Sequence, residues 1–315
     1  MPSLRTHPTL RLCGTVILAL GGLACMAGVS GSAAGVVNPP ETGSLPWRNV
    51  GSWAYWLDNP DLAQLGASRF DLLVIDPSAD GSPVRQFTAQ QIGMLRRAHP
   101  RRRVVAYLSI GQAEAYRGYW QRTWRPGSPD WLGARDCAWP ANYWVKYWQP
   151  AWQALLLRYL DAIIAAGFDG VYLDRVDAYQ ERYAAGHRED MVRLVTDLAH
   201  YARARARGGA DFGIIVQNAE ELARDHPDYP ALVTGVAREE VYIQATDIPT
   251  SRTERQQAQR YLDIFLRRGR LVLTVDYASR SELICAAYRL SQAKGYLPCV
   301  TAVGLDRLPL SAGCQ

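Results

Sequence analysis

Eight short runs of apolar, β-branched and aromatic residues recur along the chain, and each is followed by turn residues. These runs predict strands over residues 52–57, 70–76, 104–110, 170–174, 212–218, 236–243, 271–276 and 297–303, of which 236–243 is the least regular. Stretches with helical periodicity between them predict helices over residues 88–98, 151–166, 190–205, 253–267 and 280–294. Several helices are expected to end in a glycine directly before the next strand, at Gly167, Gly269 and Gly295.

Strands that are almost continuously apolar and alternate with helices are typical of a parallel sheet covered on both faces. Eight such units predict an α/β fold, a single-domain (β/α)8 TIM barrel over residues 50–315. A doubly wound open sheet is the alternative, and it usually carries a glycine-rich phosphate loop after its first strand. The turn after 52–57 instead continues with Asp58, Asn59 and Pro60, and no phosphate-loop motif occurs anywhere, so we expect no nucleotide partner.

The N-terminus has the pattern of a targeting segment. Arg5 and Arg11 precede an apolar run over residues 12–29, which ends in small residues up to Ala34. This order predicts a secretory signal peptide over residues 1–34, followed by an N-terminal linker over 35–49. The alternative is an uncleaved membrane anchor. The remainder has no apolar run long enough to span a bilayer, so we expect a secreted or periplasmic protein without a stable membrane span.

The charge of the chain is mild and scattered. The formal net charge is +5, and only two of the 35 cationic residues are lysines, Lys146 and Lys294. The tightest basic cluster is Arg101 to Arg103, at the end of a predicted helix. A nucleic-acid site needs a concentrated basic patch. We therefore expect this cluster to lie on a solvated surface, and no nucleic-acid partner.

Four cysteines remain after the predicted signal peptide: Cys137, Cys285, Cys299 and Cys314. An even number in an exported protein predicts at least one disulfide bond, although the sequence does not decide among the three possible pairings. The cysteines and the five histidines lack the spacing of a zinc site. We expect no bound metal and no cofactor.

Acidic residues stand at or just beyond the ends of most predicted strands: Asp76, Glu114, Asp174, Glu220, Glu239 or Glu240, and Asp276. In a TIM barrel this edge forms the active site. A single Asp there often caps the following helix, but several facing carboxylates repel one another unless their charge is used. The two uses we consider are metal binding through oxygen ligands and glycoside hydrolysis through a pair of carboxyls.

The tryptophans favour the sugar hypothesis, because flat aromatic rings stack on the apolar faces of sugars. All ten lie between Trp47 and Trp152, and most fall in the long connection after the third predicted strand. A spacing of four predicts a buried helix stripe for Trp144, Trp148 and Trp152. The candidates for an exposed rim are Trp120, Trp124, Trp131 and Trp139.

Several long motifs, taken together and in order, resemble a known family. They are SWAYWL, FDLLVIDP, VVAYLSIGQAEAYRGYW, YWVKYWQPAWQALLLRYLDAIIAAGFDGVYLDRVDAY, IIVQNAEEL, GVAREEVYI and LTVDYA. They resemble the glycoside hydrolase family 114-like TIM barrels, the endo-α-1,4-polygalactosaminidase family. The resemblance covers about Trp53 to Val303 and implies a (β/α)8 barrel that cleaves a partly de-N-acetylated, cationic galactosamine polysaccharide.

The resemblance also implies site residues. It places the catalytic acids on Asp174, as nucleophile, and Glu220, as general acid/base, with the reverse assignment left open. Their predicted strands are neighbours, which favours a retaining mechanism. The expected substrate-binding residues are Tyr55, Asp76, Ser109, Gln112, Glu114, Tyr172, Asp177, Asn218, Glu239 and Asp276, together with Trp120 and Trp124. A non-catalytic polysaccharide-binding barrel is the alternative, and the presence of both Asp174 and Glu220 favours the enzyme; a metal-dependent enzyme is a weaker third possibility.

Overall fold

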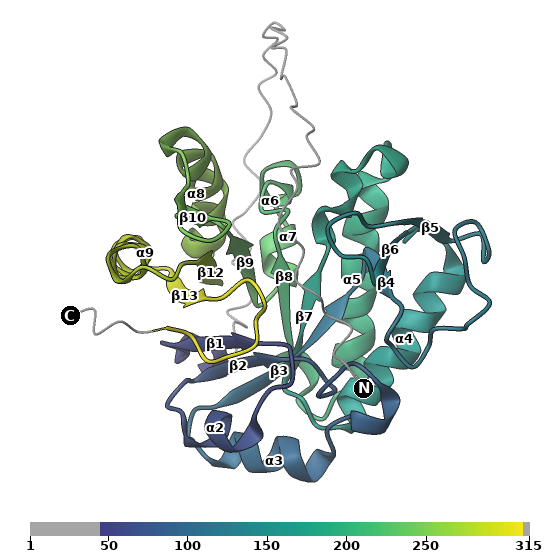
Figure 1. Ribbon diagram of the computed structural model, residues 1–315, viewed down its shortest axis with the longest axis horizontal. Helices are drawn as coiled ribbons and strands as arrows, with labels where there is room; N and C mark the ends of the chain where they lie inside the picture. Colours follow the sequence, from purple (N-terminus) through teal and green to yellow (C-terminus); the bar gives the residue numbers. More distant parts are fainter. Residues whose placement is uncertain (1–44, 311–315) are drawn as a thin grey trace, which may run out of the picture.

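The computed structural model describes residues 45–310, and its centre is an eight-stranded parallel sheet curved into a nearly closed barrel (Figure 1). The sheet order is β1-β2-β3-β7-β8-β9-β12-β13, and every hydrogen-bonded neighbour pair is parallel. The strands are β1 (Trp53–Trp56), β2 (Leu72–Ile75), β3 (Arg103–Ser109), β7 (Gly170–Asp174), β8 (Gly213–Gln217), β9 (Gly235–Glu239), β12 (Leu271–Tyr277) and β13 (Leu297–Thr301). The predicted (β/α)8 barrel is confirmed.

The first and last strands meet at a seam. The indole Nε1 of Trp53 on β1 donates to the carbonyl oxygen of Leu297 on β13 at 2.8 Å. Directly after β1, the amides of Leu57 and Asp58 donate to the carbonyl oxygen of Leu305 at 2.8 and 3.0 Å. These contacts join the two edges of the sheet in place of a regular parallel ladder.

Helices cover the outside of the barrel between consecutive strands. The main ones are α2 (Leu62–Ala67), α3 (Ala89–Arg97), α4 (Pro150–Ala165), α5 (Arg188–Arg205), α8 (Arg252–Arg267) and α9 (Ser281–Ala293), while the short helices α6 (Leu222–Asp225) and α7 (Tyr229–Leu232) follow β8. Single 3-10 turns are η1 (Pro83–Arg85), η2 (Val176–Gln180), η3 (Arg182–Ala184) and η4 (Gly209–Asp211). Thr88 and Ser251 begin α3 and α8 with capping boxes. The predicted helix-ending glycines adopt positive φ, as such termini require: Gly167, Gly269 and Gly295.

A small antiparallel sheet lies between β3 and α4, where no strands were predicted. It consists of β4 (Gln112–Glu114), β6 (Asn142–Val145) and β5 (Leu132–Arg135) in that order, and a two-stranded ribbon of β10 (Ile243–Gln244) and β11 (Ile248–Pro249) follows β9. Trp144 lies in β6, and Trp148 precedes α4. The predicted helix stripe is therefore wrong for both, because only Trp152 of the three lies in the helix, where it is fully buried.

The barrel has two apolar layers. Alternate strand residues such as Val74, Val105 and Ile215 pack inside the barrel, and the residues between them pack against the helices. At the N-terminal end, Trp47 of the short helix α1 (Leu45–Arg48) packs beneath the barrel and donates from Nε1 to the carbonyl oxygen of Asp211 at 2.8 Å. A Cβ at Gly213 would lie 2.3 Å from the Trp47 ring, so this approach requires glycine.

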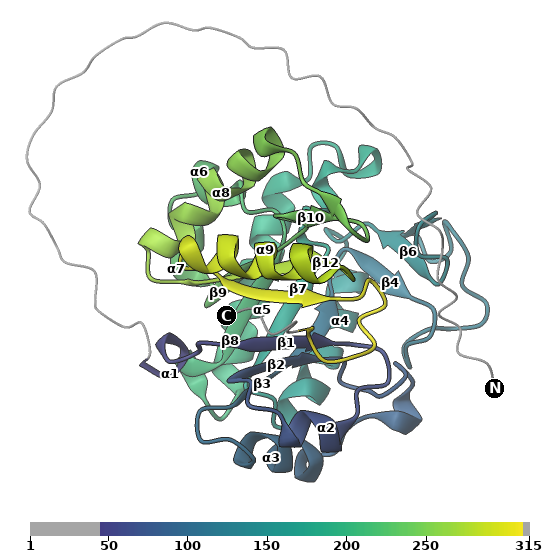
Figure 2. The same cartoon turned by 60° about the vertical axis from the view of Figure 1, so that its left-hand side comes forward.

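The short helix α1 lies within the linker expected over residues 35–49. Figure 2 shows α1 at the end of the barrel opposite β4 and β6. Trp47, within the linker expected over 35–49, is buried against the barrel, whereas Arg48 and Asn49 are exposed. The predicted signal peptide over 1–34 lies outside the described residues. Within residues 45–310, no helix combines the length and the apolar character needed to span a membrane.

The structure tests the predicted disulfide bond only in part, because Cys314 lies outside the described residues. Cys299 points into the barrel, is fully buried and has no disulfide partner, and burial raises the pKa of its thiol to about 12. No disulfide bond joins two cysteines within residues 45–310. Cys314 lies outside the described residues, so at least one bridge involving the remaining cysteines stays a prediction, and Cys299 is not part of it.

Candidate active site

Asp174 ends β7 and points into the mouth of the barrel. It is two residues beyond Tyr172, which lies in the interior apolar layer, so the alternation of the strand directs both inward. The hydroxyl of Tyr107 donates to Asp174 Oδ2 at 2.6 Å, and the amide of Arg175 donates to Oδ1 at 2.7 Å. Arg175 has a left-handed φ of 59°, which turns the chain sharply after the strand. The carboxylate is thus fixed at the mouth while remaining partly exposed.

Glu239 ends β9 and points into the same space. It stands two residues beyond Ala237 of the interior layer, and it is half-buried. Gln217 Nε2 donates to Glu239 Oε2 at 2.6 Å, and the hydroxyl of Tyr277 donates to Oε1. Burial raises the pKa of Glu239 to about 7, and the negative charge of Asp174 acts in the same direction. A carboxyl with this pKa is protonated in a large fraction of molecules near neutral pH.

Glu220 lies on the loop after β8 and is paired with a cation. Asn218 and Ala219 both have positive φ, of 61° and 56°, so the chain leaves the strand before it reaches Glu220. Arg238 Nε donates to Glu220 Oε1 at 3.1 Å, and Arg238 Nη1 donates to Asn218 Oδ1 at 3.0 Å. Burial raises the pKa of Glu220, and the charge of Arg238 opposes that shift. Asp177 is close enough to interact with the charges of both Glu220 and Arg238.

Asp276 faces away from the mouth. Its neighbours Val275 and Tyr277 belong to the interior layer, so the alternation of β12 turns Asp276 towards the helices. It is fully buried, and Oδ1 accepts from the amides of Tyr242 and Ile243 at 2.7 and 2.9 Å. Burial raises the pKa of Asp276 to about 7, although these two hydrogen bonds oppose the shift. Asp276 therefore holds the loop after β9, which differs from the substrate-binding role expected from the sequence.

Asp76 and Glu114 share a buried arginine. Arg117 Nη1 contacts Asp76 Oδ1 at 2.7 Å, and Arg117 Nε contacts Glu114 Oε2 at 2.6 Å. All three residues are almost completely buried. Burial alone lowers the pKa of Arg117, but the two carboxylates raise it well above its usual value. The charges of Asp76 and Glu114 are thus used to fix the β4 region, which differs from the expected contact with a sugar amine.

Other expected binding residues surround the mouth in a hydrogen-bonded network. Tyr55 donates to Gln217 Oε1 at 3.1 Å, and Gln112 Nε2 donates to Asp136 Oδ2 at 2.6 Å. The hydroxyls of Ser109 and Tyr172 are buried and have no hydrogen-bond partner among the described residues.

Trp120 and Trp124 pack within the β4–β6–β5 region rather than standing free on a rim. Their rings contact each other at 5.4 Å, Trp120 contacts Tyr143 at 4.8 Å, and Trp124 contacts Trp131 at 4.9 Å. Trp131 is buried, whereas Trp139 is 41% exposed. Of the four tryptophans expected on a rim, Trp139 is the most exposed and Trp131 does not belong to a rim.

Four side chains that hold the carboxyls were not predicted from the sequence: Tyr107, Tyr277, Gln217 and Arg238. Tyr107 and Gln217 occupy inward positions of predicted strands and Tyr277 directly follows the strand predicted over 271–276, so strict two-residue alternation was a signal that could have identified them. Arg238 was not detectable in this way, because its contact with Glu220 depends on the two left-handed residues after β8.

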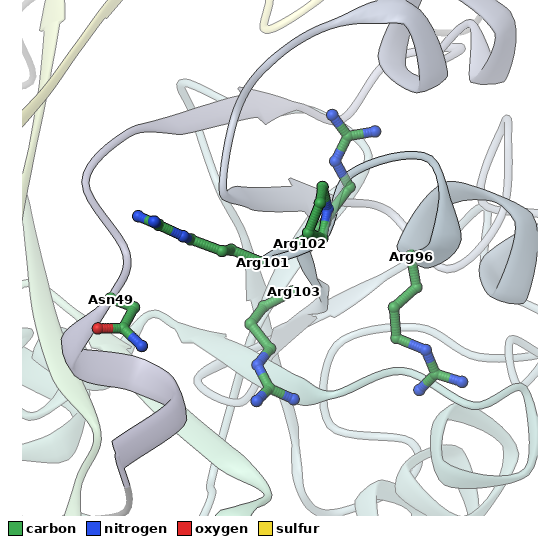
Figure 3. A pocket seen from close by; sticks show the side chains of 6 residues that line it. Asn49, Arg96, Arg101, Arg102 and Arg103 are labelled. Carbon is green, nitrogen blue, oxygen red and sulfur yellow. The ribbon is translucent and has the colours of Figure 1, made fainter.

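A pocket of about 280 Å³ lies at the opposite, N-terminal end of the strands (Figure 3). It is lined by Asn49, Arg96, Pro100, Arg101, Arg102 and Arg103. Arg102 is almost fully buried and donates to carbonyl oxygens at the end of α2, including those of Leu65 and Ser68, at 3.0 and 2.6 Å. The expectation of a wholly solvated arginine cluster is thus wrong for Arg102.

Within residues 45–310, no group of three or more His, Cys, Asp or Glu side chains is arranged to hold a metal ion.

Comparisons with known proteins agree with this architecture. A sequence profile described as glycoside-hydrolase family GH114 matches residues 34–314. An uncharacterized protein of Deinococcus radiodurans is 40% identical over 267 residues, 83% of each chain. An uncharacterized protein of Thermotoga maritima is 36% identical over 257 residues, which cover 78% of this chain and 76% of its own.

Two solved structures have a similar fold. The glycoside hydrolase domain of PelA from Pseudomonas aeruginosa is 21% identical with a TM-score of 0.64, covering 83% of this chain and 98% of that domain. Ega3 of Aspergillus fumigatus, in complex with galactosamine, is 19% identical with a TM-score of 0.63, covering 83% of this chain and 96% of its own. At these identities the similarity shows a shared barrel.

Proposed function

Because this chain belongs to glycoside hydrolase family GH114, we propose that it hydrolyses a cationic, partly de-N-acetylated galactosamine polysaccharide. The observation that carries the proposal is the pair Asp174 and Glu239, two carboxyls that point into one mouth in different hydrogen-bonded environments. Glycoside hydrolysis needs such a pair, with one group ionised and one protonated. The galactosamine bound to the structurally similar Ega3 supports the choice of sugar.

We assign Asp174 as the nucleophile and Glu239 as the general acid/base. In the first step an Asp174 oxygen bonds to the anomeric carbon, while the Glu239 proton passes to the departing glycosidic oxygen. In the second step Glu239 takes a proton from water, the water oxygen bonds to the anomeric carbon, and Asp174 is released. The negative charge of Asp174 raises the pKa of Glu239, which supports a pair of carboxyls that interact across one mouth.

Glu220, the residue assigned to this role from sequence, remains the competing candidate. Its pKa is also raised by burial, but Arg238 is within 3.1 Å and stabilises the ionised form. A general acid must carry a proton at the start of the reaction. This difference favours Glu239, and Glu220 then serves with Asp177 to increase the negative charge around a cationic substrate.

The decisive experiment measures reducing ends released from partly de-N-acetylated galactosamine oligomers. We expect release by the parent protein, slower release from fully N-acetylated oligomers, and no release by Asp174→Asn. Binding of the oligomers without release would favour the non-catalytic binding barrel. Neither binding nor release would contradict the proposed substrate.

The activity should depend on pH through Glu239. Its pKa is raised to about 7, and the acid form is required, so we expect kcat to fall as the pH rises above about 7. The Tyr277 hydroxyl stabilises the ionised form of Glu239 and lowers its pKa. Tyr277→Phe should therefore move this alkaline limb to higher pH. A pH profile of kcat for both proteins measures the shift, and a limb that moves to lower pH would contradict the assignment.

We further propose that the protein acts in the periplasm or after secretion. The charged, apolar and small-residue order of residues 1–34 supports export, and these residues lie outside the described part of the chain. N-terminal sequencing of exported protein should begin near residue 35. A chain that begins at Met1 would contradict signal cleavage.

A further inference from the structure

Three aromatic side chains from separate segments form a continuous surface, which we call the aromatic wall: Trp144, Trp148 and Tyr183. Trp144 comes from β6, Trp148 from the turn before α4, and Tyr183 from η3. The Tyr183 ring lies 5.7 Å from the Trp144 ring and 6.3 Å from the Trp148 ring, and it is nearly parallel to Trp148, at 22°. Tyr183 is the outermost of the three and is 37% exposed.

His187 and Arg175 pack against the two tryptophans of the aromatic wall. His187 stacks on Trp148 with ring centres 3.5 Å apart and planes inclined by 2°. The Arg175 guanidinium lies 5.2 Å from the centre of the Trp144 ring, and Arg175 also contacts Asp136 at 3.4 Å. The two tryptophans are thus fixed by packing, and Tyr183 presents its surface to solvent on a rigid base.

The wall adjoins the catalytic mouth. Arg175, which packs on Trp144, directly follows Asp174 in the chain. Tyr183 is close enough to Asp177 and Arg175 for their charges to affect the pKa of its hydroxyl. A polymer with one unit at Asp174 and Glu239 can therefore continue over the wall.

The charges beside Tyr183 suit a sugar with a free amine. Glu181 is exposed and stands two residues before Tyr183 in the chain. Its negative charge, like that of the half-buried Asp177, raises the pKa of the Tyr183 hydroxyl. The neighbouring cations are Arg175, which is paired with Asp136, and the exposed Arg182. An aromatic face flanked by carboxylates can bind the apolar face of a hexosamine ring and its ammonium group together.

We propose that the aromatic wall and Glu181 form a second sugar-binding subsite, which holds a de-N-acetylated hexosamine unit of the polymer away from the point of cleavage. This inference rests on the proposed function and extends it to the choice of chain length and amine content. Occupation of the subsite adds binding energy for long chains and none for a single sugar. The enzyme should accordingly prefer internal bonds of long, cationic chains.

The test measures binding in the Asp174→Asn background, where substrate persists. Calorimetry with long de-N-acetylated galactosamine oligomers should show about tenfold weaker binding for Tyr183→Ala and near-parent binding for Tyr183→Phe, which keeps the ring. Glu181→Gln should weaken binding of de-N-acetylated oligomers several-fold and leave N-acetylated oligomers unaffected. Galactosamine monosaccharide should bind equally to all variants.

Tyr201→Ala is the matched control, because Tyr201 lies on α5 and bonds to Asp161 on the outer helical layer. It should bind long oligomers as the parent does. Unchanged binding in Tyr183→Ala, or an equal loss for monosaccharide and long oligomers, would overturn the subsite while hydrolysis by the parent still supports the proposed function. If the Asp174→Asn protein binds no galactosamine oligomer, both proposals fail.

Discussion

Glu239→Gln is expected to lower kcat on galactosamine oligomers by about 10²–10⁴-fold, because the amide keeps the shape of the side chain and cannot donate the proton. Asp174→Asn should lower kcat at least as much, because it removes the attacking oxygen anion. Both amides can keep hydrogen bonds at the mouth, so circular dichroism and thermal unfolding should show folded proteins. Steady-state kinetics on one oligomer of defined length measures the effects.

An activated substrate separates the two roles. A galactosaminide with a dinitrophenolate leaving group needs little protonation in the first step, so Glu239→Gln should release a rapid burst of dinitrophenolate and recover most of its kcat/KM, whereas Asp174→Asn should not. Turnover of Glu239→Gln after the burst should stay slow, because Glu239 also activates the water of the second step. Glu220→Gln is the matched control and should retain more turnover than Glu239→Gln, with its main effect on KM. If Glu220→Gln is inactive and Glu239→Gln is not, the assignment made from the sequence is correct and ours is wrong.

Arg117→Met is expected to lower the free energy of unfolding by about 3–5 kcal/mol, because it leaves the carboxylates of Asp76 and Glu114 buried without their cation. The Arg117 guanidinium also packs at 5.0 Å from the Tyr116 ring and donates to the Tyr159 hydroxyl at 3.2 Å. Urea denaturation measures the change, and thermal unfolding serves if the variant folds poorly.

Two further variants distinguish loss of charge balance from loss of packing. Arg122→Met replaces an exposed arginine in the same connection and should change stability by about 0.5 kcal/mol or less. Adding Asp76→Asn and Glu114→Gln to Arg117→Met removes all three charges and should restore part of the lost stability. A triple variant less stable than Arg117→Met alone would show that packing, rather than unpaired charge, dominates.

The barrel was predictable because its strands and helices repeat one simple pattern. Each predicted strand overlaps an observed one, from β1 to β13, since a strand buried on both faces must be apolar throughout. The β4–β6–β5 sheet was not predictable in this way. Its strands are three or four residues long, β5 and β6 are partly exposed, and the buried strand β4 has the sequence Gln-Ala-Glu, so no apolar run marks them. The four-residue spacing of Trp144 and Trp148 matched the period of a helix, although neither residue lies in one.

The candidate site was predictable by position and less so by role. Acids at strand ends do gather at one edge of a barrel, but the face to which each points depends on a single residue of register. Asp174 and Glu239 are in phase with the interior, and Asp276 is out of phase. An arginine that neutralises an acid can lie far from it in the sequence, as Arg117 lies 41 positions from Asp76. Composition alone does not reveal such pairings.

The seam between β1 and β13 has a consequence for how the chain reaches its native state. The bond from Trp53 to Leu297 spans 244 positions, so the ring of strands closes only when nearly all of the chain is present. Contacts this distant in sequence slow folding. A nascent or truncated chain that lacks β13 leaves β1 and β12 as open strand edges, which invite pairing with other chains. Loss of the last strand should therefore produce aggregation rather than a smaller stable domain.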